Sequence, residues 1–198
     1  MFSGIVEAVM PIKSSQELDN AYRIQIEKPS DFNDIKLGDS IACDGVCLTV
    51  EAFDADQMTF ALAAETIKIL KWNPEQWLGK RINLERSLRF GDRIHGHLVT
   101  GHVDSLGIVK RADLEGESFF LDVEVADSIL PYVWKKGSIT LNGVSLTVNE
   151  LNNNLVSVCL IPETLKRTNL GDVKVSSTLN VEPDYMARAI QRSLEVRK

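Results

Sequence analysis

Short runs in which apolar and polar residues alternate recur along most of the chain, and many of the apolar ones are β-branched. Alternation of this kind, bounded by turn residues, predicts half-buried β-strands. In the first half the runs cover residues 4–9, 22–27, 39–43, 47–53, 58–63 and 81–85. In the second half they cover residues 107–110, 119–125, 137–141, 145–151, 155–161 and 178–182. Each half therefore carries about six predicted strands.

Four sequence blocks occur twice, in the same order. "SGIVEAV" matches "TGHVDSL", "DSIACDGVCLTV" matches "GSITLNGVSLTV", "AAETIK" matches "IPETLK", and "RINLERS" matches "TLNVEPD". The spacing is nearly constant, since Gly4 matches Gly101 at an offset of 97 and Gly45 matches Gly143 at an offset of 98. An internal repeat of this length indicates two homologous domains. The predicted division is residues 1–97, residues 98–184 and a tail over residues 185–198.

Two matched dipeptides predict tight hairpins. Asp44-Gly45 and Asn142-Gly143 lie between predicted strands, and Asp-Gly and Asn-Gly are the strongest short hairpin signals. With little helix to cover a sheet face, six antiparallel strands are best satisfied by closing into a small barrel without exposed edges. The predicted fold class is therefore all-β, with two homologous six-stranded antiparallel barrels in tandem.

The tail predicts a helix that begins after Pro183-Asp184. Met186, Ile190 and Leu194 recur one turn apart, and basic residues gather towards the end, where cations suit the helix dipole. A stripe of three turns does not stabilise itself in water. We expect it to need a partner surface, most simply the same helix from other subunits.

Composition narrows the class of protein. The chain has 198 residues, 44% of them hydrophobic, and a formal charge of −6, which argues against a nucleic-acid partner. No apolar run reaches the length of a membrane span, and the apolar N-terminal stretch has no basic residue before it, so a cytoplasmic location is expected. Cys43, Cys47 and Cys159 are odd in number and widely spread, which favours reduced thiols.

All three histidines lie within eight residues, as His95, His97 and His102. His95 and His97 on a strand would share a face, as zinc ligands can. No cysteine or carboxylate stands at metal-ligand spacing, however, so no metal is expected here. Gly96 and Gly101 suggest instead that the backbone bends closely around something as it crosses from one half to the other.

Cys47 and Ser145 are the repeat-equivalent residues of most interest. Each follows a predicted turn and precedes a threonine two residues on, which places both side chains on one strand face. The plain alternative is a small residue that fills a barrel interior. Several hydroxyls predicted to point inward favour a hydrogen-bonded polar ligand in each barrel. These inward sets are Ser40, Cys47, Thr49, Glu65 and Thr66, and Ser138, Ser145, Thr147, Glu163 and Thr164.

Lys136, in the second half, is expected to be solvated, as lysines in such a position usually are. Phe2 could belong to a loose terminus, but Val99 occupies the equivalent internal position, so we expect Phe2 to be ordered in a strand.

The motifs "MFSGIVEA", "GDSIACDGVCLTV", "ERSLRFGDRIHGHLVTGHVD", "KGSITLNGVSLTV" and "IPETLKRTNLG" together resemble the riboflavin synthase family, over essentially the whole chain. The resemblance implies two six-stranded antiparallel Greek-key barrels and a C-terminal helix that holds a homotrimer. It implies a dismutation of two molecules of 6,7-dimethyl-8-ribityllumazine into riboflavin and 5-amino-6-ribitylamino-2,4-pyrimidinedione. One lumazine would lie in the N-terminal barrel of one subunit and the other in the facing C-terminal barrel of a neighbour. No cofactor or metal is implied.

The resemblance also implies site residues. Ligand contacts in the first barrel would be Gly4, Ile5, Val6, Cys47, Leu48, Thr49, Ala61, Leu62, Ala63, Ala64, Glu65 and Thr66. Those in the second barrel would be Gly101, His102, Val103, Lys136, Ser145, Leu146, Thr147, Cys159, Leu160, Ile161, Pro162, Glu163 and Thr164. Residues tied to activity would be Phe2, Ser40, Cys47, Thr49, His97, His102 and Ser145. We expect His102 to shuttle protons, with Cys47 or Ser40 assisting.

The chain departs from the family pattern at three positions. His95 stands where glycine is common and inherits no role, and the turns carry Asp44 and Asn142 where asparagine first and aspartate second are expected. The main alternative function is a non-catalytic lumazine- or flavin-binding protein of the same fold; a zinc-dependent barrel protein is the other. Whether the trimer sits inside a lumazine synthase shell stays open.

Overall fold

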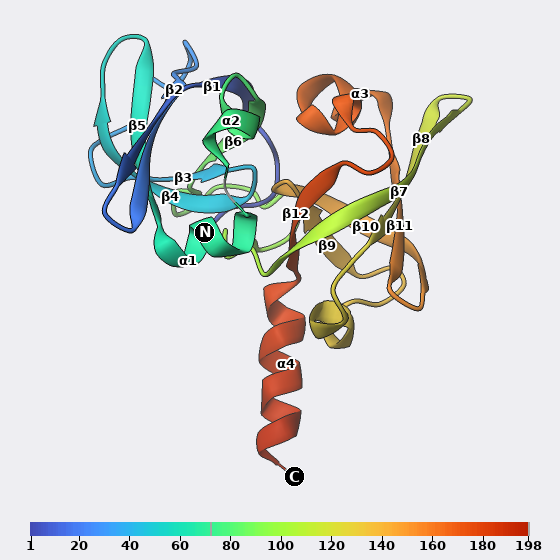
Figure 1. Cartoon of the computed structure of the whole chain (residues 1–198). Coiled ribbons are helices and arrows are strands. Elements are labelled where there is room, and N and C mark those ends of the chain that lie inside the picture. Colours follow the sequence, from blue (N-terminus) through green and yellow to red (C-terminus); the bar gives the residue numbers. More distant parts are fainter. Residues whose placement is uncertain (72, 198) are drawn as a thin grey trace.

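The computed structural model describes residues 1–71 and 73–197, and it contains two closed six-stranded barrels that stand side by side (Figure 1). The first consists of β1 (Ala8–Leu18), β2 (Ala21–Glu27), β3 (Ser40–Cys43), β4 (Val46–Phe53), β5 (Gln57–Ala63) and β6 (Arg81–Arg86). The second consists of β7 (Ser105–Glu115), β8 (Ser118–Glu124), β9 (Ser138–Leu141), β10 (Val144–Asn152), β11 (Leu155–Leu160) and β12 (Thr178–Pro183). The helices are α1 (Ala64–Leu70), α2 (Pro74–Trp77), the 3-10 helix η1 (Asp127–Tyr132), α3 (Pro162–Arg167), the 3-10 helix η2 (Asn169–Asp172) and α4 (Tyr185–Val196).

The two barrels have the same topology. Around the first, the strand order is β1, β2, β5, β4, β3 and β6, and around the second the corresponding order is β7, β8, β11, β10, β9 and β12. All pairings are antiparallel, and each barrel encloses its own apolar core. The predicted all-β fold with two tandem six-stranded barrels and a C-terminal helix is confirmed.

Both predicted hairpin turns form. Asp44 and Gly45 have φ values of 46° and 81°, and Asn142 and Gly143 have 47° and 77°. Positive φ at both central residues is the geometry of a type I′ turn, which explains the Asp-Gly and Asn-Gly pairs. The two turns meet back to back, because a Cβ atom on Gly45 would lie 2.7 Å from the main-chain nitrogen of Gly143. Only glycine fits at that contact.

The first strand of each barrel differs from the prediction. Strands were expected over residues 4–9 and 107–110, whereas β1 spans Ala8–Leu18 and β7 spans Ser105–Glu115. Residues 3–7 are irregular because Gly4 adopts a positive φ of 73° and its amide donates to a side chain rather than to a neighbouring strand. The predicted strand there was therefore wrong over its first four residues.

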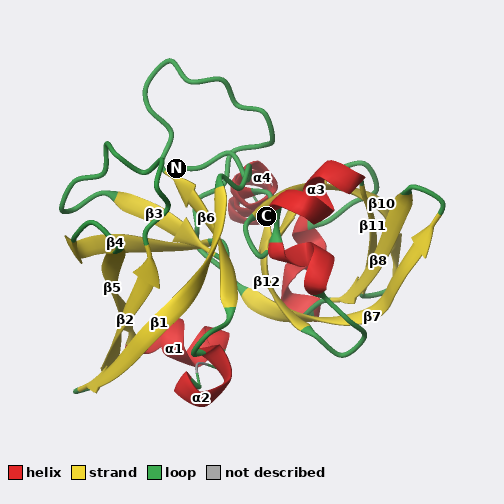
Figure 2. Ribbon diagram, turned by 90° about the horizontal axis from the view of Figure 1, so that it is seen from above, coloured by secondary structure: helices red, strands yellow, loops and turns green. Residues whose placement is uncertain are grey.

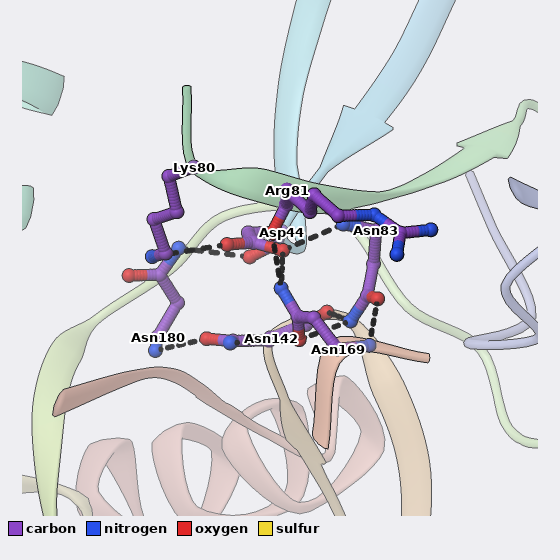
Figure 3. A network of polar contacts seen from close by, with 7 residues as sticks. All are labelled: Asp44, Lys80, Arg81, Asn83, Asn142, Asn169 and Asn180. Atoms are coloured by element: carbon purple, nitrogen blue, oxygen red, sulfur yellow. Dashed lines mark hydrogen bonds and ion pairs between the residues drawn. The ribbon is translucent and has the colours of Figure 1, made fainter. Parts of the chain in front are cut away.

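A buried polar network joins the barrels where the two turns meet (Figure 3). The Asn83 main-chain N–H donates to Asp44 Oδ1 at 2.7 Å, and the equivalent Asn180 N–H donates to Asn142 Oδ1 at 2.8 Å. The amide side chains cross over: Asn83 Nδ2 donates to the Asn142 carbonyl and Asn180 Nδ2 to the Asp44 carbonyl, both at 2.9 Å. Each barrel thus satisfies main-chain groups of the other, which fixes their relative orientation.

Asn169 breaks the symmetry of this network. Its Nδ2 donates to Asp44 Oδ1 at 2.8 Å and its Oδ1 accepts from Asn83 at 3.0 Å, while Lys80 Nζ lies 3.4 Å from Asp44 Oδ2. Burial raises the pKa of Asp44, and Lys80, Asn83 and Asn169 act in the opposite direction. Asp44 is therefore a buried carboxylate at a position where the second repeat uses Asn142.

The raised pKa of Asp44 predicts a pH-dependent contribution to folding. Since the pKa in the folded state lies above its ordinary value of 3.8, the folded protein binds this proton more tightly than the unfolded chain does. The associated stability is fully present below 3.8 and is lost as the pH rises through the folded value. Asp44→Asn removes this contribution, so wild type is expected to gain stability relative to the variant on acidification.

Urea unfolding of both proteins from about pH 7 to about pH 4 checks this expectation. Asp127→Asn, the same change at an exposed position, is the control and is expected to follow wild type. Parallel pH profiles for wild type and Asp44→Asn would contradict the prediction.

The C-terminal helix α4 forms as predicted. Asp184 caps it by accepting a hydrogen bond from the Met186 N–H at 2.9 Å. Seen from above, α4 lies end-on between the two barrels (Figure 2), and it projects away from both (Figure 1). Met186, Ile190 and Leu194 are 51%, 58% and 53% exposed, so its apolar stripe has no cover in the single chain.

The sequence predicts reduced cysteines and no membrane span. Cys43, Cys47 and Cys159 are free thiols. Within residues 1–71 and 73–197, no helix combines the length and the apolar character that crossing a membrane requires.

Candidate functional site

The polar strand faces that contain Cys47 and Ser145 lie outside the barrels. On β4, Val46, Leu48 and Val50 fill the core, whereas Cys47 is half-buried and Thr49 is exposed. The same alternation holds on β10, where Ser145 is half-buried and Thr147 is exposed. The expectation that these side chains point inward was wrong, because apolar residues already occupy each barrel interior.

The irregular segments that open the two repeats are exchanged between the barrels. The Cys47 N–H donates to the Gly101 carbonyl, and the Ser145 N–H donates to the Gly4 carbonyl, both at 2.8 Å. Val103, two residues after Gly101, is buried in the core of the first barrel, and Val6 is buried in the core of the second. Residues 4–6 therefore lie on the second barrel and residues 101–103 on the first, the reverse of the predicted assignment.

Two buried glutamates hold these segments. Glu85 accepts hydrogen bonds from the main-chain N–H groups of Ser3 and Gly4, at 2.7 and 3.0 Å. Glu182 accepts from the N–H groups of Thr100 and Gly101, at 2.9 and 3.0 Å. Burial raises the pKa of Glu85, and its hydrogen bonds oppose that shift. Sequence reasoning missed both glutamates, although they occupy equivalent positions in the matched blocks "RINLE" and "TLNVE".

On the first barrel, the exchanged segment closes a pocket of about 460 Å³. Cys47 on β4 and His102 on the segment both line it, together with Arg188 of α4. Asp104, and Glu65 and Thr66 at the start of α1, complete the polar lining. We call this pocket the first half-site. It brings together six of the predicted site residues, namely Cys47, Glu65, Thr66, Gly101, His102 and Val103.

On the second barrel, the equivalent place is occupied differently. The residue that corresponds to His102 is Ile5, and a histidine arrives instead from the crossing segment: His97 Nδ1 lies 2.7 Å from Ser145 Oγ. Burial lowers the pKa of His97, and the charge of Asp184 opposes that shift. A mostly neutral imidazole beside a hydroxyl can accept its proton. Ser145, His97 and residues 4–6 are called the second half-site.

Gly96 permits the contact between His97 and Ser145. A Cβ atom at Gly96 would lie 2.1 Å from the Ser3 carbonyl oxygen and 2.7 Å from Ser145 Oγ. The expected close backbone approach at Gly96 and Gly101 is confirmed: Gly96 approaches Ser3 and Ser145, and Gly101 approaches Cys47 and Phe2.

Ser40 and His95 line other pockets than Cys47 and His102, whereas Phe2 packs against Cys47. Phe2 is fully buried and pairs with Val99 through main-chain hydrogen bonds of 2.8 and 3.0 Å, so it supports the strand behind Cys47 and is ordered as predicted. Ser40 faces Thr49 across the β3–β4 ladder but lines another pocket, of about 440 Å³. His95 is exposed and lines a third pocket.

The remaining predicted contacts fall into two groups. Ala61 and Cys159 are half-buried strand residues. The exposed or half-buried residues that follow them include the first residues of α1 and α3. These are Ala63, Ala64, Glu65 and Thr66, and Ile161, Pro162, Glu163 and Thr164. In the other group the side chains lie in the barrel cores, which leaves only main-chain atoms for a ligand. Its members are Val6, Leu48, Leu62, Val103, Leu146 and Leu160.

Lys136 occupies an unusual backbone position. Its φ is 68°, and in the first repeat the equivalent residue is Gly38 with a φ of 87°. The two main-chain N–H groups make matching bonds, to the carbonyls of Val148 and Val50. A lysine with this positive φ lowers the stability of the fold by about 1 kcal/mol relative to glycine. Its ammonium group is exposed, and Lys136 stays a candidate ligand contact.

The described residues contain no group of three or more histidine, cysteine, aspartate or glutamate side chains arranged to hold a metal ion. The three histidines instead separate: His97 contacts Ser145 on the second barrel, His102 lines the pocket on the first, and His95 lines another pocket.

Comparison with known proteins gives one family. A model described as the lumazine binding domain matches residues 3–87 and again residues 100–184. Among curated relatives, the riboflavin synthase of Brucella abortus is 38% identical over all of both chains, and that of Mycobacterium tuberculosis is 40% identical over 97% of each. The riboflavin synthase of Photobacterium phosphoreum is 36% identical over all of this chain and 91% of its own.

Solved structures of LumP share the fold. The complex with riboflavin has a TM-score of 0.82 at 24% identity, and the complex with 6,7-dimethyl-8-(1'-D-ribityl) lumazine has a TM-score of 0.81 at 22% identity. Both cover 92% of this chain and 99% of the LumP chain.

Proposed function

Because this chain belongs to the riboflavin synthase family, whose lumazine binding domain it carries twice, we propose that it catalyses the riboflavin synthase reaction. Two molecules of 6,7-dimethyl-8-ribityllumazine react, and one donates a four-carbon unit to the other. The products are riboflavin and 5-amino-6-ribitylamino-2,4-pyrimidinedione. Donor and acceptor are the same compound, so two similar binding sites are required, and the duplicated half-site is the observation that carries the proposal.

The half-sites are similar in backbone and different in chemistry, as a donor and an acceptor site must be. The first offers the Cys47 thiol and His102, and the second offers the Ser145 hydroxyl paired with His97. The reaction begins with loss of a proton from the 7-methyl group of one lumazine, while a nucleophile adding at C7 activates the other. A histidine and a hydroxyl or thiol in each half-site provide the groups for both tasks.

The structure favours Cys47 over Ser40 as the partner of His102, since only Cys47 lines the same pocket. We retain His102 as the proton shuttle of the first half-site. His97 is the corresponding candidate in the second, because its lowered pKa keeps it neutral and able to accept a proton.

We further propose a homotrimer in which the first half-site of one chain faces the second half-site of a neighbour. Both half-sites are on outer barrel walls, so bound lumazines can meet only where two walls face each other. The uncovered stripe of Met186, Ile190 and Leu194 on α4 supports assembly through this helix. Facing half-sites would convert a bimolecular encounter into an intramolecular one.

The deciding experiment adds 6,7-dimethyl-8-ribityllumazine to the purified protein and follows riboflavin by its absorbance. The expected stoichiometry is one riboflavin for every two lumazines consumed. Binding of lumazine without riboflavin formation would favour the non-catalytic binding protein instead.

Variants test the assigned roles. His102→Gln and Cys47→Ser are expected to lower the rate, with the larger loss, about 10²-fold or more, for His102→Gln. His95→Gln is the matched control and should retain the wild-type rate. A rate near that of wild type for His102→Gln would remove His102 from the mechanism.

A further inference from the structure

The position of His102 depends on an irregular segment, residues 101–104, rather than on a strand or helix. On its N-terminal side the segment is held by Glu182, which accepts from Gly101, and by the Cys47 N–H, which donates to the Gly101 carbonyl. On its C-terminal side the Asp104 N–H donates to the Val181 carbonyl at 3.0 Å, and the Asp104 carboxylate forms an ion pair with Arg188 Nη2. The His102 side chain is exposed, so these flanking contacts hold the main chain that carries its ring.

The equivalent segment in the first repeat is held by a different kind of residue. Glu7 corresponds to Asp104, and it pairs with Arg86, which donates to it from both its main-chain N–H and its guanidinium. Arg86 belongs to strand β6, a rigid part of the barrel. In the second repeat the residue that corresponds to Arg86 is Pro183, the last residue of β12, which carries no charge. The cation for Asp104 therefore comes from α4 itself.

Arg188 lies where α4, the second barrel and the first half-site meet. Ala187, beside it, is buried, and the Arg188 guanidinium lies 6.0 Å from the ring of Tyr132 in η1. Arg188 also lines the pocket that contains Cys47 and His102. Its Nε is buried and, among the described residues, makes no hydrogen bond. The guanidinium thus pairs with Asp104 on one side and faces the first half-site on the other.

We propose that Arg188 is a positioning residue of the first half-site, which holds residues 101–104, and with them His102, through its ion pair with Asp104. The seating of α4 then determines the geometry of the first half-site. The pair is partly exposed, with 36% and 27% of the two side chains accessible, so its loss displaces the segment without unfolding the barrel. The turnover readout rests on the proposed function; the spectroscopic one does not.

The test compares four variants of the full chain. Arg188→Met removes the charge and keeps the apolar stem, Asp104→Asn removes the other partner, and Arg188→Lys is the conservative replacement. Arg192→Met is the matched control, because Arg192 is on the same helix, pairs with Glu195 and is 73% exposed. Light scattering reports the oligomeric state of each protein. Imidazole NMR signals report the histidines, of which the chain has three, assigned by His→Gln variants.

Arg188→Met and Asp104→Asn are expected to shift the His102 signals and leave those of His97 in place, with the oligomeric state unchanged. Turnover should fall about ten- to a hundredfold, mainly through kcat, because a misplaced catalytic group costs rate more than binding. Arg188→Lys should restore both readouts in part, and Arg192→Met should match wild type. Unmoved His102 signals in Arg188→Met, or shifts of His97 and His102 together with loss of assembly, would overturn the proposal. If wild type forms no riboflavin, the proposed function fails, and the histidine spectra still decide the role of Arg188.

Discussion

Replacing Gly101 by alanine is expected to destabilise the protein by about 2–4 kcal/mol and to lower riboflavin formation at least about a hundredfold. The φ of Gly101 is +82°, which strains any residue with a side chain. The added Cβ would also lie 2.6 Å from the Cβ of Cys47 and 2.9 Å from its main-chain nitrogen, both rigid parts of β4. The segment that carries His102 must therefore move away from the first half-site.

Gly116→Ala separates the two causes of this destabilisation. Gly116 also has a positive φ, +64°, but nothing lies within 4 Å of the position its Cβ would take. This variant is expected to lose only about 1 kcal/mol and to keep its activity. Denaturant unfolding and riboflavin formation are measured on both. A Gly101→Ala protein no less stable than Gly116→Ala would show that the contact with Cys47 is not as rigid as the structure indicates.

Glu182→Gln is expected to cost about 2–3 kcal/mol, the cost of breaking buried hydrogen bonds to a charged group. The Glu182 side chain is 2% exposed and accepts from the Thr100 N–H, the Thr100 hydroxyl and the Gly101 N–H. A glutamine keeps one acceptor oxygen and sets an NH2 group against a main-chain donor. Because these bonds hold the segment that carries His102, the rate of riboflavin formation should fall with the stability.

Glu150→Gln is the matched control for Glu182→Gln. Glu150 is 53% exposed and pairs with Lys135 on the surface, where the same substitution is expected to change the free energy of unfolding by less than about 0.5 kcal/mol. Thermal and denaturant unfolding report both variants. Similar stabilities for the two would argue against Glu182 as the anchor of residues 100–101.

Much of the fold could be predicted because local pattern and internal repetition point the same way. The Asp44-Gly45 and Asn142-Gly143 turns lie where the residue types require, and the strands other than β1 and β7 lie close to where alternation and repeat predict them. The error over residues 4–7 arose because apolar alternation also occurs in an irregular segment whose amides bind Glu85. Only the tertiary partner distinguishes the two cases.

The candidate site was predicted in its residues and misplaced in its geometry. Alternation shows that Cys47 and Thr49 share a face of β4, but it does not say which face is inside when an exchanged segment half-buries the outer one. A repeat alignment likewise matches Gly4 with Gly101 without showing which barrel each one touches. Glu85, Glu182 and Arg188 escaped notice because their roles lie in contacts 80 or more residues away in sequence.

The exchange of the opening segments has a consequence for how the gene can change. Each half-site is encoded in two distant stretches, one in each copy of the repeat, so the copy that specifies a segment is not the copy that specifies the wall it covers. A side chain at position 4 would collide with Ser145, and one at position 101 would collide with Cys47. The two copies are therefore free to diverge in their half-site chemistry only as a crosswise pair. A chimaera that joins the first repeat of one relative to the second repeat of another combines mismatched halves in both sites at once.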